Sequence, residues 1–178
     1  HIKQGEKIAI IGESGSGKTT LLNIIHGEEI PTSGQISFDG QNLSRQEITS
    51  LSSYILQDSH YFDTLSLEDN ILLGLDKKED RLNHILKTTG LEHLKNRTLS
   101  NDSLSGGEKQ RLEIARALYH DSQLILADEI KANLDLENSR KISDLLFSLP
   151  QTVIEVIHHY TEEDLKHYDQ IIHLSKEK

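Results

Sequence analysis

The stretch IAIIGESGSGKTT, residues 8–20, decides the fold class of this chain. Its first four residues are apolar and lead into a glycine-rich turn, as expected for a buried strand of a parallel sheet. Residues 18–26 then have the pattern of a helix that ends at Gly27. A strand, a loop and a helix in this order form the unit from which α/β folds with parallel sheets are built.

The turn matches the phosphate-binding pattern G-x-x-x-x-G-K-[ST] in full, between the strand and the helix that the pattern requires. Its glycines let backbone N–H groups point at phosphate oxygens, and the helix N-terminus adds a favourable dipole. Lys18 is placed to reach the β and γ phosphates, and the Thr19 hydroxyl to ligate Mg²⁺. The alternative is a flexible turn with a solvated lysine, which the flanking strand and helix disfavour. The residues expected to bind nucleotide are Gly12, Glu13, Ser14, Gly15, Ser16, Gly17, Lys18, Thr19 and Thr20.

Composition excludes several classes of protein. A length of 178 residues suits one domain, and the absence of cysteine excludes disulfide scaffolds and thiolate metal sites. A net charge of -10 without a basic stripe argues against a nucleic-acid partner, and the ten histidines show no zinc-site spacing. No apolar run approaches the roughly 18 residues of a membrane span. Because the chain begins with His1 and contains no Met, we expect it to be N-terminally incomplete.

The rest of the chain alternates strands and helices around one insertion. Residues 58–104 have the character of polar helices, with a start at Ser66 and an end at Gly90, and we interpret them as a helical subdomain. A capping box of Ser44 and Glu47 opens another helix. Further strands are expected at 34–40, 54–56, 124–127, 153–157 and 171–174, and further helices at 106–119 and 137–149. The pattern predicts an α/β fold with a largely parallel sheet and a small antiparallel part near the N-terminus.

A second glycine turn, LSGGEKQR at residues 104–111, opens a helix with Ser105 as its expected N-cap. Its exposed N–H groups favour an anion. One nucleotide does not need two such cradles from one chain, so we expect each chain to lend this turn to the nucleotide of a partner in a head-to-tail dimer. A capped helix without a ligand remains the alternative.

A pair of acids follows the apolar run LILA, residues 124–127. The run predicts a buried strand that delivers Asp128 and Glu129 at its C-terminal end, where open α/β sheets bind ligands. Asp128 can hold Mg²⁺ through water, and Glu129 can orient or deprotonate the water that attacks the γ phosphate. A solvated strand end is the alternative.

These motifs, in this order and over nearly the whole chain, resemble the nucleotide-binding domain of ABC transporters. The resemblance implies a P-loop NTPase core at 1–57 and 105–178, with the helical subdomain at 58–104. It implies Walker A at 12–19, the glutamine loop at Gln57, the signature at 104–110 and Walker B at 124–128. The residues of the signature expected to act in trans are Leu104, Ser105, Gly106, Gly107, Glu108 and Gln110.

The resemblance also implies roles for single residues. Glu129 is then the catalytic base, His158 the switch histidine and Lys18 the lysine that supports catalysis, while Asp135 belongs to a loop, 132–135, that contacts the other subunit. His159 is the alternative switch residue, but His158 directly follows the strand expected at 153–157. The metal ligands implied are Thr19, Gln57 and Asp128, with Gln57 also contacting nucleotide.

The sequence departs from the family pattern in a few places. Ile130 and Lys131 follow the glutamate, and Ile157 precedes the histidine, where other residues are usual. The residue that stacks on adenine is expected upstream of His1. Residues 97–104 lack the Gly-Glu-x-Gly pattern common in exporters, whereas the segments 57–70 and 168–172 are similar to exporters, and we favour the exporter type.

The resemblance implies an ATPase that binds ATP with Mg²⁺, closes with a second nucleotide-binding domain into a homodimer or heterodimer, and drives a transmembrane domain. Its expected location is the cytoplasmic face of the cell membrane. A soluble ABC-class ATPase of DNA repair or translation is one alternative, disfavoured by the single Walker A motif and the lack of heptads. A regulatory module without turnover is another, disfavoured by the presence of Glu129.

Overall fold

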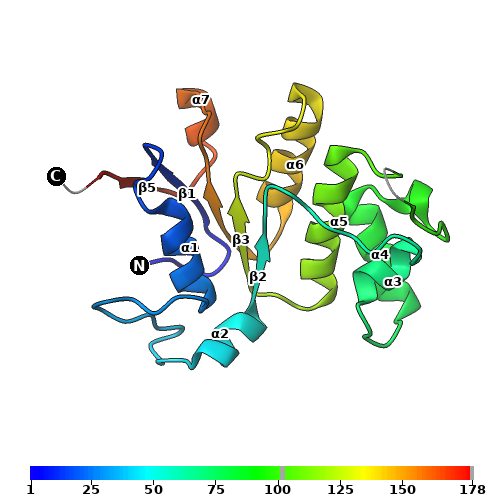
Figure 1. Ribbon diagram of the computed structural model, residues 1–178, viewed down its shortest axis with the longest axis horizontal. Coiled ribbons are helices and arrows are strands. Elements are labelled where there is room, and N and C mark those ends of the chain that lie inside the picture. The colour runs from blue at the N-terminus through cyan, green and yellow to red at the C-terminus, as the bar shows by residue number, and fades with distance from the viewer. Residues whose placement is uncertain (101–102, 177–178) are drawn as a thin grey trace. The chain divides into compact units, whose positions relative to one another are not determined.

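The computed structural model describes residues 1–100 and 103–176, which divide by their contacts into two compact units (Figure 1). The first unit consists of the described residues of His1–Tyr54, Ser122–Glu129 and Leu149–Lys178. The second consists of the described residues of Ile55–Asp121 and Ile130–Ser148. The boundaries of the helical subdomain expected from the sequence remain predictions.

A five-stranded sheet forms the centre of the first unit, in the spatial order β2-β3-β4-β1-β5. The strands are β1 (Lys7–Gly12), β2 (Ser52–Ile55), β3 (Leu124–Asp128), β4 (Thr152–Val156) and β5 (Gln170–Leu174). β1 pairs in parallel with β4 and β5, and β3 pairs in parallel with β4. The carboxyl ends of these strands therefore lie along one edge of the sheet, where ligands bind in open α/β folds.

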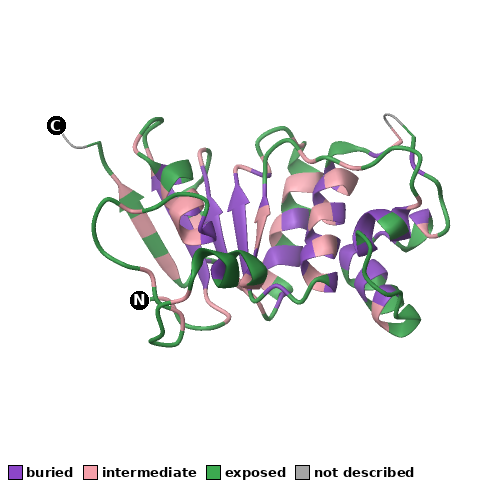
Figure 2. Cartoon of the chain, turned by 60° about the horizontal axis from the view of Figure 1, so that its bottom comes forward, coloured by how far each residue is buried: buried purple, intermediate pink, exposed green. Residues whose placement is uncertain are grey.

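Helix α1 (Lys18–His26) covers one face of this sheet. Leu22 of α1 is fully buried in a cluster with Ile8 and Ile10 of β1 and with apolar residues of β3 and β4. The inner strands are buried along their length, whereas β5, at the edge, alternates between exposed and half-buried residues (Figure 2). Two shorter helices complete the unit, α2 (Arg45–Leu51) and α7 (Glu162–Leu165).

The second unit is helical. Its helices are α3 (Leu67–Leu72), α4 (Glu79–Thr89), the 3-10 helix η1 (Glu92–Leu94), α5 (Gly106–Tyr119) and α6 (Leu136–Ser148). Leucines and isoleucines from α3 and α4 pack against Leu112, Ala115 and Tyr119 of α5 in one apolar core. Among the described residues, no helix combines the length and the apolar character that crossing a membrane requires.

Most of the predicted elements are confirmed within two residues, because their ends carry local signals. Ser44 and Ser105 close the capping boxes with Glu47 and Glu108, Ser66 caps α3, and Gly90 ends α4 in a left-handed conformation. The strand predicted at 54–56 runs instead from Ser52 to Ile55, and Leu56 beyond it is half exposed.

The strand predicted at 34–40 was wrong. Phe38 and Gln41 form an isolated antiparallel bridge around Asp39 and Gly40, both of which have positive φ, +48° and +75°. Such a pair of residues makes a two-residue hairpin turn. The small antiparallel part near the N-terminus is this bridge, since no described strand pairs with the segment.

Candidate active site

The glycine-rich loop between β1 and α1 is held by close packing on one side. Gly12 has a φ of +151°, and a Cβ added there would lie 2.2 Å from the carbonyl oxygen of Leu174 on β5. Gly17, at the N-cap of α1, has a φ of +92° and no side-chain cap. The N–H groups of the first turn of α1 therefore have neither intrahelical partners nor a capping side chain, as an anion site requires.

Lys18 is the cation of this loop. Its side chain is 5% exposed, and its Nζ donates to the carbonyl oxygens of Gly12 and Glu13 at 3.0 Å each. The Oγ of Ser16 is buried and has no hydrogen-bond partner among the described residues. The loop thus presents a folded-back ammonium group and a buried hydroxyl, while the remaining positions of the turn lie at its surface, namely Glu13, Ser14, Gly15, Gly17, Thr19 and Thr20.

Asp128 ends β3 beside the start of α1. Its Oδ2 accepts a hydrogen bond from the Thr19 hydroxyl at 2.9 Å and another from the Tyr54 hydroxyl at 3.2 Å. Its Oδ1 is buried and has no partner in the part of the chain that the structure describes. A hydroxyl and a carboxylate are hard oxygen donors, and an unpaired buried carboxylate oxygen is suited to a divalent cation such as Mg²⁺. These residues therefore fit the metal that the resemblance implies.

In the described ranges 1–100 and 103–176, no three histidine or acidic side chains come together as a metal-binding group. Mg²⁺ bound with a nucleotide usually keeps several waters and takes phosphate oxygens as ligands, so it needs only one or two ligands from the protein.

Glu129 and His158 meet at the carboxyl edge of the sheet. Glu129 follows β3 with a φ of +54°, an uncommon conformation for a residue other than glycine, so the extended backbone of the strand ends before this residue. Its Oε1 lies 3.2 Å from Nε2 of His158, which comes two residues after the end of β4. The two side chains are 27% and 31% exposed. Of the two histidines considered from the sequence, His158 makes this contact.

The signature segment lies in the second unit. The Oγ of Ser105 accepts from the Glu108 N–H at 3.3 Å, and the Ser105 N–H donates to Oε2 of Glu108 at 2.8 Å, which closes the N-terminal capping box of α5. Burial alone would raise the pKa of Glu108, but hydrogen bonds from Ser105 and His93 outweigh burial and hold the pKa below its usual value. Leu104 is buried in the helical core.

The two glycines of the signature also have a packing role. A Cβ on Gly107 would lie 2.6 Å from Oδ1 of Asn138, and one on Gly106 would lie 3.0 Å from Cδ2 of Leu134. Asp135 accepts from both the backbone and the side chain of Asn138, at 3.0 and 2.6 Å, at the start of α6. The segment that follows Walker B is therefore packed against the start of α5.

Gln110, on the buried side of α5, donates to the carbonyl oxygen of Gln57 at 2.8 Å. Gln57 is exposed and belongs to the second unit, whereas Thr19 and Asp128, with which the resemblance groups it as a ligand, belong to the first. The structure brings together Thr19 with Asp128, Glu129 with His158, and Ser105 with Glu108. Tyr54, which also contacts Asp128, was missed, since the sequence marks it only as one residue of a short strand.

The chain is similar in sequence to a known protein family and to proteins of known name. The family model described as ABC transporter matches residues 1–132. The chain is 40% identical over 162 residues to the ABC transporter ATP-binding protein YxdL of Bacillus subtilis (strain 168), an alignment that covers 83% of this chain and 62% of that protein. It is 35% identical over 181 residues to the lactococcin-A transport/processing ATP-binding protein LcnC of Lactococcus lactis subsp. lactis, covering 93% of this chain and 25% of LcnC.

Among solved structures, the chain resembles cbiO1 of Clostridium perfringens, described as part of the ABC transporter complex cbiONQ. The TM-score is 0.78 at 30% sequence identity, and the match covers 89% of this chain and 69% of that one. The chain spans less than two thirds of the length of the two curated relatives.

Proposed function

Because this chain belongs to the ABC transporter family, we propose that it binds ATP in the loop 12–20, hydrolyses it, and powers a transporter. The observation that carries the proposal is the arrangement in the first unit. There the phosphate-binding loop, a carboxylate paired with the Thr19 hydroxyl, and a contact between Glu129 and His158 lie on the carboxyl edge of one sheet. Phosphoryl transfer depends mainly on positioning and on electrostatic stabilisation, and each of these groups supplies one or the other.

The loop binds the phosphates in this proposal. The N–H groups at the start of α1 surround the phosphate oxygens, and Lys18 exchanges its two backbone acceptors for oxygens of the β and γ phosphates. Thr19 and Asp128 hold Mg²⁺, which neutralises charge on the phosphates when it is bound. The net charge of -10 does not oppose this, since the positive site is local.

Glu129 is the base in this proposal. Its carboxylate orients the attacking water and accepts a proton from it, and His158 holds that carboxylate through Nε2. The left-handed backbone at Glu129 and the contact with Nε2 of His158 together restrict where the carboxylate lies.

The signature completes the site in trans. The capped N-terminus of α5, with Ser105 and the two glycines after it, contacts the γ phosphate on a second nucleotide-binding domain, and Asp135 lies at that interface. ATP then joins two subunits, and loss of the γ phosphate after hydrolysis shifts the population toward open dimers.

A transmembrane partner completes the transporter. The second unit exposes four large apolar side chains, Phe62, Leu65, Leu73 and Leu75, around a depression of about 550 Å³. Exposed apolar side chains gathered in this way are typical of protein interfaces, and we assign the patch to the transmembrane partner at the cytoplasmic face of the membrane. The similarity to LcnC, named as a transport protein, supports the exporter type.

The experiment that tests the proposal measures ATP hydrolysis with Mg²⁺ for the parent, for Glu129→Gln and for Glu137→Gln, with dimerisation followed by light scattering. Glu137 is an exposed carboxylate on α6 and serves as the control. We expect the parent and Glu137→Gln to hydrolyse ATP, and Glu129→Gln to stop hydrolysing while ATP-bound dimers accumulate. Full turnover by Glu129→Gln would contradict the role of Glu129, and a parent that neither binds nor hydrolyses ATP would contradict the function.

A further inference from the structure

The carboxylate of Asp128 is used asymmetrically. Both hydroxyl groups that reach it, those of Thr19 and Tyr54, donate to the same oxygen, Oδ2, at 2.9 and 3.2 Å. The other oxygen, Oδ1, is buried without a partner among the described residues. Two donors on one oxygen hold a carboxylate against rotation, so that the remaining oxygen is presented in one direction.

Thr19 cannot do this alone once a metal is bound. In the proposed function its hydroxyl oxygen ligates Mg²⁺ together with Asp128. The hydrogen bond from Thr19 to Oδ2 of Asp128 therefore joins two residues that both ligate the metal. Tyr54 contacts Asp128 from the strand β2, which lies next to β3 in the sheet, and it is not among the residues proposed to ligate the metal.

Tyr54 is itself held on several sides. At the start of β2, the Gln123 N–H donates to the Leu51 carbonyl at 2.8 Å, and the hydroxyls of Ser53 and Ser122 lie 2.6 Å apart. The ring of Tyr54 meets that of His26 edge-on, with 5.5 Å between their centroids.

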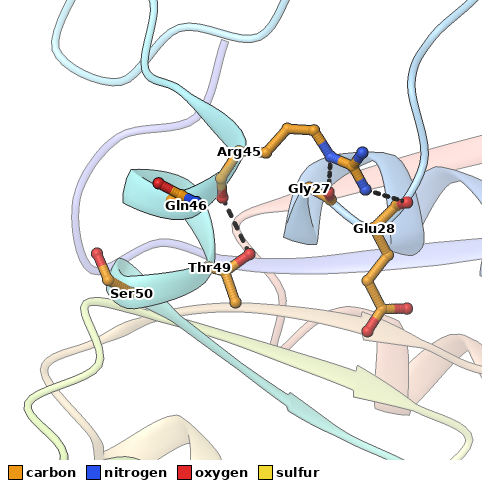
Figure 3. A pocket seen from close by; sticks show the side chains of 6 residues that line it. All are labelled: Gly27, Glu28, Arg45, Gln46, Thr49 and Ser50. Carbon is orange, nitrogen blue, oxygen red and sulfur yellow. Dashed lines mark hydrogen bonds between the residues drawn. The ribbon is translucent and has the colours of Figure 1, made fainter.

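His26 is fixed in turn. Its Nδ1 lies 2.8 Å from the Ser52 hydroxyl, which donates its proton to the carbonyl oxygen of Ile48, so that Nδ1 of His26 is the donor to Ser52. Arg45 ties α2 to the end of α1, because its guanidinium donates to the carbonyl oxygens of Gly27 and Glu28 (Figure 3). Thr49, also on α2, donates to the carbonyl oxygen of His26 at 3.0 Å.

The hydroxyl of Tyr54 remains a donor. An ionised carboxylate has no proton to donate, so in the contact with Oδ2 of Asp128 the hydroxyl of Tyr54 is the donor.

We propose that Tyr54 is a positioning residue for the metal. Its hydroxyl holds Oδ2 of Asp128 so that Oδ1 faces the divalent cation that accompanies the nucleotide. The inference rests on the proposed function, because it concerns the Mg²⁺ that is bound with ATP. It adds to the metal site a residue that touches neither the nucleotide nor the metal and acts through Asp128.

The test compares Tyr54→Phe with the parent. The variant removes only the oxygen and keeps the ring that packs on His26. The control is Tyr160→Phe, which changes the same atom on a tyrosine that is 41% exposed. The probe is Mn²⁺, which takes the same oxygen ligands as Mg²⁺ and is counted by its electron paramagnetic resonance signal. Free Mn²⁺ is titrated against each protein at saturating ATP, and ATP binding is measured separately in EDTA.

We expect Tyr54→Phe to need about ten-fold more Mn²⁺ for half saturation, the effect of losing one hydrogen bond to a charged group. ATP binding in EDTA and the circular dichroism spectrum should equal those of the parent, and Tyr160→Phe should equal the parent in every readout. Half saturation of Tyr54→Phe at the parent's Mn²⁺ concentration would overturn the role of Tyr54 and leave the proposed function intact. A parent that binds ATP but no Mn²⁺ would overturn both.

Discussion

Gly12 and Gly17 are required at the residue scale for different reasons. At Gly12 a side chain meets the backbone of β5, because a Cβ would lie 2.2 Å from the Leu174 carbonyl oxygen. At Gly17 a Cβ has no atom within 4 Å, and only the positive φ of +92° disfavours it.

We therefore expect Gly12→Ala to lower the free energy of unfolding by about 3 kcal/mol or more, since both overpacking and backbone strain contribute. Gly17→Ala should cost about 1 kcal/mol, the penalty of a left-handed residue alone. Urea unfolding of both variants measures the difference. Equal losses would show that the contact between Gly12 and β5 does not constrain the loop.

His26 makes the stability of the first unit depend on pH. Burial lowers its pKa, and the nearby carboxylate of Glu28 only partly offsets burial, so the folded state favours the neutral ring. A histidine in the unfolded chain titrates near pH 6.5, about its ordinary value. Below that pH the unfolded state binds the proton more readily than the folded state, so stability falls as the pH falls.

The prediction is that the parent loses more unfolding free energy between pH 7 and pH 5 than His26→Gln does. His84→Gln, on the exposed face of α4, serves as the control and should follow the parent. Urea unfolding at the two pH values measures this loss. Equal losses of unfolding free energy in the parent and in His26→Gln would assign the pH dependence to other groups.

At the element scale, the C-terminal end of α5 organises the helices around it. The hydroxyl of Tyr119 donates to the carbonyl oxygen of Asp76 at 2.7 Å and accepts from the N–H of Lys78 at 2.8 Å. The guanidinium of Arg81 lies 5.0 Å above the same ring and also pairs with Asp121. One side chain thus fixes the segment that leads into α4.

Tyr119→Phe keeps the ring and removes both hydrogen bonds, which leaves the Lys78 N–H without its acceptor. We expect a loss of about 2 kcal/mol in the free energy of unfolding, the usual effect of an unsatisfied, partly buried backbone donor. Differential scanning calorimetry of the variant measures it, with Tyr160→Phe as a neutral comparison. An unchanged transition would mean that the segment 73–78 is held without the hydroxyl.

How far the sequence predicts these elements depends on where the signals lie. α1 and α5 have the predicted bounds because glycines and a serine cap mark their ends within a few residues. The strand predicted at 34–40 failed because alternation does not supply a partner strand, and pairing is decided by the rest of the fold. The contact of Tyr54 with Asp128 was also out of reach, since it joins residues 74 positions apart through neighbouring strands.

The candidate site shows the same contrast between features that short motifs mark and features that depend on distant residues. The types and the order of the residues in the loop, at Asp128 and at Glu129 were given by short motifs. The left-handed backbone of Glu129 and the contact that distinguishes His158 from His159 became visible only in the structure. The glycines at 106 and 107 were interpreted through an anion alone, although the side chains of Leu134 and Asn138 also exclude larger residues there.

At the scale of the whole molecule, we expect the two units to have different tasks. The first binds the nucleotide through Lys18, and the second contributes Ser105 to dimerisation. A ligand that binds only the folded state stabilises it by about 2.7 kcal/mol at a concentration 100 times its Kd. We expect ATP with Mg²⁺ to raise the Tm of the parent and of Ser105→Arg, but not that of Lys18→Ala, because Lys18 belongs to the loop and Ser105 to the signature.

Light scattering on the same samples should show ATP-dependent dimers for the parent alone, because the arginine blocks the start of α5. Thermal unfolding thus reports on the loop, and dimerisation on the signature. ATP-dependent dimers of Ser105→Arg would contradict the composite site, and stabilisation of Lys18→Ala equal to the parent's would contradict the role of Lys18.

The order of strands in the sheet has a consequence for synthesis on the ribosome. β1 is made before every other strand, yet it is enclosed by β4 and β5, and the Lys7 N–H bonds to Asp169, 162 residues further along the chain. Contacts at such separation form slowly, because a long loop must close before any bond rewards it. The helices α3, α4 and α5, by contrast, contact one another within residues 67–119. We therefore expect the nascent chain to form its helical unit before β1 pairs with β4 and β5, and the nucleotide-binding loop to be among the last parts of the protein to fold.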